Sequence, residues 1–196
     1  MPTTALPLVL RDPGYLLSAP LLTAIPAMTV AGSIFTDAWP AGWVSNGATE
    51  DGSDFSYATK IEAIYAAEFF DPLQWATTDR NGSLAFAMLN FTLGSWKLAL
   101  NGGTQSTVSG TGATLSSKLI PPVPGGEVRT MLGWESLDHT VRIVVEQCIN
   151  GAEMKFSNKK APAKASIPVQ FNFEIPASGY PFAIYTAGVA RAAALS

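Results

Sequence analysis

The stretch NGATEDGSDFSYATKIEAIYAAEFFDP, residues 46–72, begins with turn residues and acids and continues as a long β-branched and aromatic run. Within residues 55–70 the odd positions from Ile61 to Phe69 are all apolar, while the even positions include the charged side chains Lys60, Glu62 and Glu68. Alternation with a period of two predicts a β-strand with one covered face. This strand would be longer than most strands of globular proteins, and it carries no set of catalytic residues.

Similar alternation elsewhere in the chain predicts a mainly β domain. The further strands are expected at residues 28–34, 128–134, 139–149, 167–175 and 182–185. Residues 36–56 and 103–126 are rich in Gly, Ser and Pro, and we expect loops there. Because the pattern contains no βαβ repeats, it favours an antiparallel sheet with one covered and one wet face.

A single helix is expected at residues 84–100, after the turn Asn81-Gly82-Ser83 and before Asn101-Gly102-Gly103. Its apolar residues go nearly all the way round, so it must be covered on both sides. The segment is too short for a comfortable membrane span and contains Asn90 and Lys97.

The chain ends are expected to lie outside the β domain, which spans residues 28–186. Residues 1–27 carry five prolines and few charges, which predicts an extended arm with no helix or strand of its own. Residues 187–196 form a small C-terminal tail. No basic segment precedes the first apolar residues, so a signal peptide is not expected.

The composition indicates a protein that hides its surface in partners. The chain has 196 residues, suited to one domain, and only 14% of them are charged against 47% that are hydrophobic. The formal net charge is −3, and no dense basic patch points to phosphate binding. The single cysteine, Cys148, excludes an intramolecular disulfide and lies in an apolar run.

The residues that usually carry chemistry are few and poorly placed for it. The one histidine, His139, adjoins Asp138, but neighbouring strand residues point to opposite faces. Glu62 and Glu68 would stand about 20 Å apart, too far for paired catalytic carboxylates. The acidic residues 48–54 lack the spacing of a calcium loop. We therefore expect no enzyme activity, no metal and no cofactor.

The order of these features resembles the major tail tube protein of long-tailed bacteriophages, particularly those of actinobacterial hosts. The resemblance covers about residues 29–186. It rests on the succession TVAGSIF (29–35), GATEDG (47–52), AEFFDPL (67–73), LNGG (100–103), PPVPGG (121–126) and PFAIYT (181–186).

This resemblance implies a small antiparallel β-sandwich or barrel flanked by one helix. Hexameric rings would join their strands into a continuous inner β-barrel, and stacked rings would form the tube through which DNA leaves the capsid. The implied partners are copies of the chain and other tail proteins at the tube ends. DNA would pass without specific binding, no membrane would be involved, and the protein would be assembled in the host cytoplasm and reside in the virion. The tubes of contractile tails and of type VI secretion share this fold.

Other functions remain open on the sequence alone. A tail terminator or a secretion-tube protein would use a related fold. A β-sandwich module that binds a ligand such as a carbohydrate would use some of the five tryptophans. Assembly into long polymers, rings or monomers would distinguish these possibilities.

Three groups of residues are candidates for roles in a tube. Residues on polar strand faces are expected to face the lumen: Lys60, Glu62, Glu68, Asp138, Arg142, Glu146 and Glu174. Two loop tips of opposite charge would stack rings if they lie on opposite ends of the ring: Glu50, Asp51 and Asp54 against Lys155, Lys159, Lys160 and Lys164. Residues of the predicted helix are expected to contact an adjacent subunit: Met88, Phe91 and Trp96.

Overall fold

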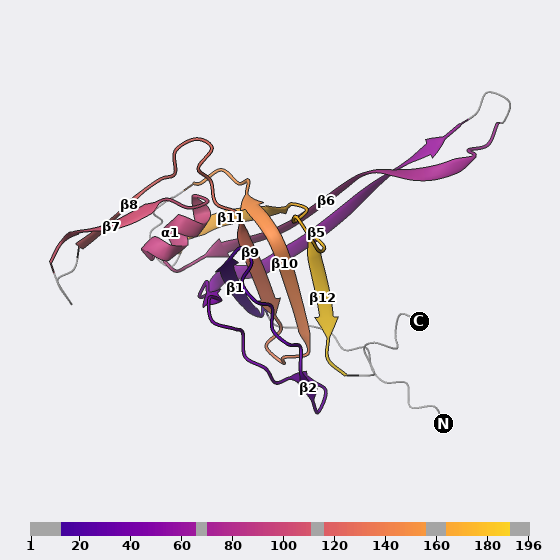
Figure 1. Ribbon diagram of the computed structural model, residues 1–196. Helices are drawn as coiled ribbons and strands as arrows, with labels where there is room; N and C mark the ends of the chain where they lie inside the picture. The colour runs from indigo at the N-terminus through magenta and orange to yellow at the C-terminus, as the bar shows by residue number, and fades with distance from the viewer. Residues whose placement is uncertain (1–12, 66–69, 111–115, 156–163, 189–196) are drawn as a thin grey trace.

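The computed structural model describes residues 13–65, 70–110, 116–155 and 164–188 as a mainly antiparallel β protein with one short helix (Figure 1). The main sheet has the order β4-β1-β9-β10-β11-β6-β5, and β12 also pairs with β10. Its strands are β1 (Tyr15–Pro20), β4 (Val44–Ser45), β5 (Thr49–Ile64), β6 (Gln74–Met88), β9 (Thr130–Glu135), β10 (Val141–Asn150), β11 (Ile167–Phe173) and β12 (Phe182–Thr186). Two small hairpins are formed by β2 (Val30–Ala31) with β3 (Ile34–Phe35) and by β7 (Thr104–Ser109) with β8 (Ser116–Ile120). The expected mainly β, antiparallel class is confirmed.

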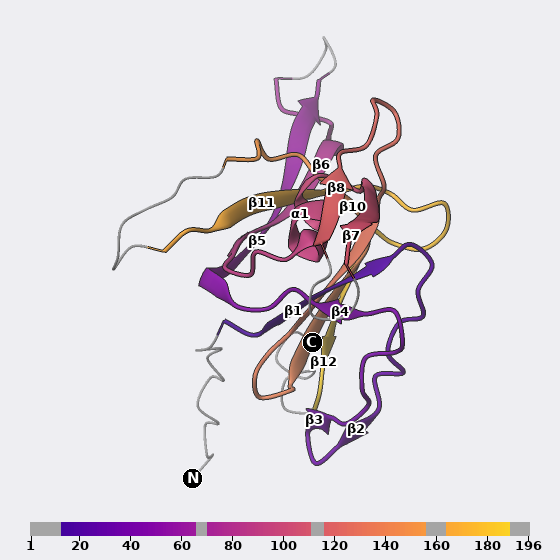
Figure 2. The same ribbon diagram turned by 90° about the vertical axis from the view of Figure 1, so that its left-hand side faces the viewer.

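Strand β10 is the branch point that makes the sheet fold over on itself. One edge pairs with β9, whereas the other pairs first with β12, from Val141 to Val145, and then with β11, from Cys148 to Asn150. As a result β11, β6 and β5 cross β9, β10 and β12 at a steep angle (Figures 1 and 2). The core between the two layers includes Leu84, Phe86, Met88, Leu132, Val145, Cys148, Ile167, Val169 and Phe171.

The central strands are covered on both faces, which corrects the expectation of one wet face. All of β9 from Met131 to Glu135 is buried. Its outer face is covered by the loop before β4, where Trp39 and Trp43 pack with ring centroids 4.6 Å apart. A Cβ added to Gly133 would lie 2.5 Å from the Trp39 ring, so glycine is what allows this close cover.

The helix predicted at residues 84–100 is wrong over its first part. Residues up to Met88 belong to β6, where Leu84, Phe86 and Met88 are buried and the alanines between them are not. Large residues alternating with alanine gave a strand because this segment pairs with β11 on one side and β5 on the other. The helix α1 is Leu93–Ala99, capped by the Thr92 side chain, which accepts from Ser95 N.

The end of the helix is where the sequence placed it. Asn101 takes a left-handed φ of 55°, and Gly102 N donates to Lys97 O at 2.8 Å. By contrast, Asn81-Gly82-Ser83 forms no turn and lies within β6.

Three other expectations about the chain's course are corrected. Residues 1–27 were expected to contain no strand, yet β1 pairs with β9 from Tyr15 to Pro20. Residues 36–56 and 103–126 were expected to be loops, but the first contains β4 and the start of β5, and the second contains the β7–β8 hairpin. The strand expected at residues 28–34 is instead the two-residue hairpin of β2 and β3. In each case the Pro or Gly residues delimit short strands that tertiary pairing stabilises.

Candidate functional site

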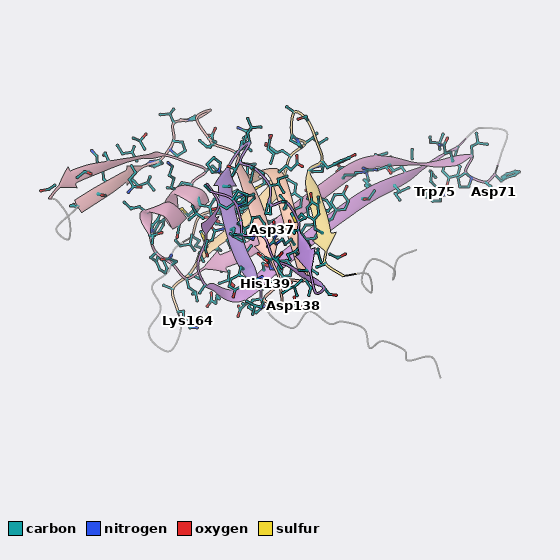
Figure 3. All side chains as sticks on the ribbon, turned by 60° about the horizontal axis from the view of Figure 1, so that its bottom comes forward. Asp37, Asp71, Trp75, Asp138, His139 and Lys164 are labelled. Carbon is teal, nitrogen blue, oxygen red and sulfur yellow. The ribbon has the colours of Figure 1, made fainter. Side chains whose placement is uncertain are left out.

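The most unusual surface is the distal part of the β5–β6 hairpin, residues 56–64 and 74–82, which we call the hairpin arm. It projects from one side of the molecule, and the β7–β8 hairpin projects from the other (Figure 1). Trp75 and Asp71 lie toward the far end of this projection (Figure 3). The two strands pair continuously from Ser53 to Ile64, with a register shift between Lys60 and Ile61.

Large apolar side chains of the hairpin arm are exposed on both of its faces. Cross-strand partners share a face, so Ile61 lies on one face with the Ala63–Trp75 pair, and Ile64 lies on the other with Gln74. Ile61 is 54% exposed, Ile64 48% and Trp75 63%. At the tip, Tyr65, Phe70 and Leu73 are also exposed. Because solvent reaches both faces, this apolar area has no cover within the described part of the chain.

The hairpin arm also presents backbone groups that need partners. Strand β5 is the last strand in the sheet order, and its described residues pair only with β6. The described residues of β12 likewise pair only with β10. β5 and β12 meet through ring contacts of Phe55 and Tyr57 with Phe182, with no ladder between them. An unpaired edge of this length is a site for pairing with another chain.

The lumen candidates do not form one surface. Lys60 and Glu62 lie exposed on the hairpin arm, where Lys60 Nζ is 2.6 Å from Glu62 Oε1. Asp138 lies in the turn between β9 and β10, while Glu146 and Glu174 lie near the β11–β12 connection. Glu68 lies outside the described residues.

The expectation that Arg142 faces the lumen is wrong. It was expected on a polar strand face, but it is 2% exposed because Phe35 and Trp39 cover this face of β10. A side chain buried within its own subunit cannot line a channel.

The condition for ring stacking, that the acidic and basic tips lie on opposite ends of the subunit, is not met. Ser166 Oγ donates to Glu50 Oε2 at 2.6 Å, and Ser166 follows Lys164 by two residues. Asp51 and Asp54 share a cavity lining with Ala152 and Pro168, which flank the lysine-rich segment. Within the described residues the acids therefore lie beside the basic segment. Lys155 is exposed, and Lys159 and Lys160 lie outside the described residues.

Of the subunit-contact candidates, Met88 is wrong. It is fully buried in the core of its own subunit and belongs to β6. Phe91 precedes α1 and is 40% exposed, and its ring centroid lies 6.2 Å from that of the half-buried Trp96.

A buried charged cluster lies between the sandwich and its outer cover. Arg142 Nη2 is 2.9 Å from Glu135 Oε1, and Arg142 Nη1 is 3.1 Å from Asp37 Oδ1. Glu135 Oε1 also pairs with His139 Nδ1 at 2.7 Å, and its Oε2 accepts from Trp39 Nε1. Figure 3 shows Asp37 and His139 in the same region of the molecule. This cluster fixes the tryptophan loop on the sheet. Its contact between Arg142 Nη1 and Asp37 Oδ1 is a charge contact without hydrogen-bond geometry, whereas Arg142 Nη2 donates to both Glu135 Oε1 and Asp37 O.

Sequence reasoning missed this cluster because its members are far apart in the chain. Asp37 and Trp39 lie in a segment that was expected to be a loop, and Arg142 was assigned to a wet face. The available signal was Glu135, directly after one predicted strand, and Arg142 on the next, together with the tryptophans in the loop.

The pKa values of Glu174 and Cys148 are shifted, and neither group resembles a catalytic one. The Gln147 side chain donates to Glu174, and with Arg129 at 3.1 Å it holds the pKa of that carboxyl below its usual value. Burial raises the pKa of the Cys148 thiol, which donates to Thr130 O, so this cysteine is an unreactive core residue.

In the described part of the chain, the surface hollow beside α1 is not lined by a set of catalytic residues. A shallow hollow of about 400 Å³ beside α1 is lined by Ser18, Asn46, Thr92, Lys97 and Arg129, among others. Among the described residues, no group of three His, Cys, Asp or Glu side chains could hold a metal ion. The described helix falls short of the length and hydropathy needed to cross a membrane.

The chain matches no model of a protein family, and a search of curated proteins gives no match.

Proposed function

We propose that this chain is the structural subunit of a phage tail tube, in which hexameric rings stack around a channel that conducts DNA. The proposal begins from the sequence resemblance and is supported by the antiparallel two-layer fold. The observation that carries it is the hairpin arm, whose apolar side chains are exposed on both faces. A large exposed apolar surface of this kind marks a protein–protein interface.

Ring closure accounts for both unpaired edges at once. The unpaired edges of the described β5 and β12 segments lie on the same subunit and are different surfaces. A head-to-tail contact joins one surface to a different one, and a rotation that closes gives a ring. In such a ring the β5 edge of one subunit would pair with the β12 edge of the next, which removes the aggregation hazard of a long unpaired β-hairpin.

The hairpin arms would form the inner wall, with one face toward the channel. Lys60 and Glu62 neutralise each other on this arm. A wall without a basic stripe does not hold the phosphate backbone, because phosphate binding grows with the number of basic contacts. DNA would then slide through without specific binding.

Negative-stain microscopy and sedimentation of the purified protein test the proposal. Tubes or stacked rings support it, rings that never stack favour a tail terminator, and a monomer at all concentrations contradicts it. A monomer that shifts only on adding a carbohydrate would instead favour a ligand-binding module.

A pair of matched variants connects the outcome to the hairpin arm. Trp75→Asp places a charge in the exposed apolar surface and should abolish assembly. Thr78→Asp adds the same charge to the arm at another exposed position, where no apolar side chain is lost, and should retain assembly. Equal assembly by both variants would remove the arm from the interface.

A further inference from the structure

The interlayer space opens to solvent along the line between β5 and β12. A cavity of about 680 Å³ lies there, which we call the seam cavity. Its apolar lining comes from both layers: Phe55, Leu84, Trp134, Val141, Ile143 and Ile184. Ile184 is 53% exposed although it faces this cavity, so the lining is incompletely covered by the described residues.

The chain enters the described structure at the mouth of this cavity. Pro13, the first described residue, is itself part of the lining. Trp134 Nε1 donates to Pro13 O at 2.9 Å, and a Cβ added to Gly52 would lie 3.4 Å from the Pro13 Cβ. Pro13 is therefore held between β9 and the irregular start of β5. Residues 1–12 begin from a fixed point beside an apolar hollow.

The sequence before Pro13 is suited to fill that hollow. It reads TTALPLVLRD over residues 3–12, and its leucines alternate at Leu6, Leu8 and Leu10. In an extended segment these three side chains share one face. Pro7 has no backbone N–H, which suits a segment lying along a sheet edge. At about 3.3 Å per residue, an extended chain from Pro13 reaches about 10 Å by position 10 and about 23 Å by position 6.

We propose that residues 6–10 dock in the seam cavity of their own subunit, with the three leucines against Phe55 and Ile184. The short reach from Pro13 favours the subunit's own cavity over that of a neighbour. This inference goes beyond the proposed function, because it concerns the isolated chain and holds whether or not tubes form.

A charge in the middle of the segment tests the docking by stability. Leu8→Asp should lower the melting temperature of the full chain by about 5 °C, because a leucine side chain is lost from an apolar site. The matched control Thr4→Asp adds the same charge outside residues 6–10 and should melt within about 1 °C of the parent protein. Identical melting of the two variants would overturn the proposal.

Disulfide trapping tests the location directly and does not depend on the stability result. Leu8→Cys combined with Ile184→Cys should form a bond within one chain in dilute, mildly oxidised protein. Cys148 is fully buried and stays out of this reaction. The control pairs Leu8→Cys with Val44→Cys, which is 64% exposed on the far side of β1 and should not cross-link.

The cross-linking outcomes are distinct on a non-reducing gel. A fast-migrating monomer for the Ile184 pair alone supports docking within the subunit. A cross-linked dimer would show that the segment enters a neighbour's cavity, and absence of a bond would show that it does not dock. Equal disulfide formation by the Val44 pair would mean that the segment samples many positions and has no defined docking site. Each of the last three outcomes overturns the proposal.

Discussion

The two ends of the β5–β6 hairpin are built from the same pair of strands, but their large apolar side chains differ in burial. Near the body, Leu84, Phe86 and Met88 are buried and the strand continues into a sheet with β11. Beyond Gly82, side chains of similar size, such as Ile61 and Trp75, are exposed. Apolar sequence therefore does not by itself place a segment in the core. Packing partners decide this: the arm touches the body at Tyr57, whose ring contacts Phe182, whereas Ile61 and Trp75 stay exposed.

The largest expected difference between the two ends is in the cost of removing a large side chain. Phe171→Ala in the body empties a fully buried site and should lower the free energy of unfolding by about 3–5 kcal/mol. Trp75→Ala on the arm should cost under about 0.5 kcal/mol. Urea denaturation of the dissociated protein measures both. Similar costs for the two variants would show that the arm is already covered in the monomer.

The buried charged cluster extends the comparison to polar groups. Glu135→Gln leaves Arg142 buried with Asp37 as its remaining carboxylate partner, and it should cost about 3 kcal/mol of stability. Lys60 and Glu62 form a pair in solvent, and Glu62→Gln should cost under about 1 kcal/mol.

A second variant separates the buried pair from its surroundings. Replacing both members, as in Glu135→Gln with Arg142→Met, should recover part of the loss, because the most deeply buried charge is removed and only Asp37, which still accepts from Met28 N, loses an ionic partner. A double variant that loses the sum of both single costs would count against this account.

The boundary between the two ends can be probed at Gly82. A Cβ at this position would lie 2.4 Å from Phe173 Cδ2, so Gly82→Ala should cost about 1–3 kcal/mol. Ala76→Gly, within the arm, removes a Cβ and should cost about 1 kcal/mol or less through backbone entropy. Thermal melting compares them. A larger effect at residue 76 would move the boundary outward.

The smallest expected effect is the pH dependence at Glu174. Its pKa is lowered from 4.5 by Gln147 and Arg129, so the folded state favours the carboxylate. The stabilisation is present above about pH 4.5 and is lost as the pH falls through the lowered folded-state pKa. Between pH 6 and pH 3 the parent protein should therefore lose slightly more stability than Glu174→Gln, by under about 1 kcal/mol. Denaturant unfolding at both pH values measures the difference.

Periodicity predicted most of the strands but not which of their faces are buried. Clean alternation located β10 and β11, where alternate residues such as Ile167, Val169 and Phe171 are buried. The same rule failed at residues 84–88, because alanines between large residues also suit a helix and the pairing of β6 with β11 is not visible in one sequence.

The candidate site was predictable only in outline. The long β5 strand was expected and begins earlier than expected, at Thr49, but its partner β6 was not. Arg142 was placed on a wet face because the cover by Phe35 and Trp39 depends on contacts across more than half of the chain. Contacts of that kind arise from tertiary packing and leave no periodic signal.

The pairing of β1 with β9 has a consequence for how the chain folds. Tyr15 pairs with Glu135, so the first described strand must wait for residues far along the chain before it finds its partner. The β5–β6 hairpin, by contrast, closes between neighbouring segments and can form early. Distant pairing slows folding, and partly folded chains with exposed strands aggregate. During synthesis we therefore expect an interval in which the hairpin arm is formed and prone to aggregate while the body is not yet folded. A cell that makes many copies would have to protect the nascent chain until β9 and β10 have left the ribosome.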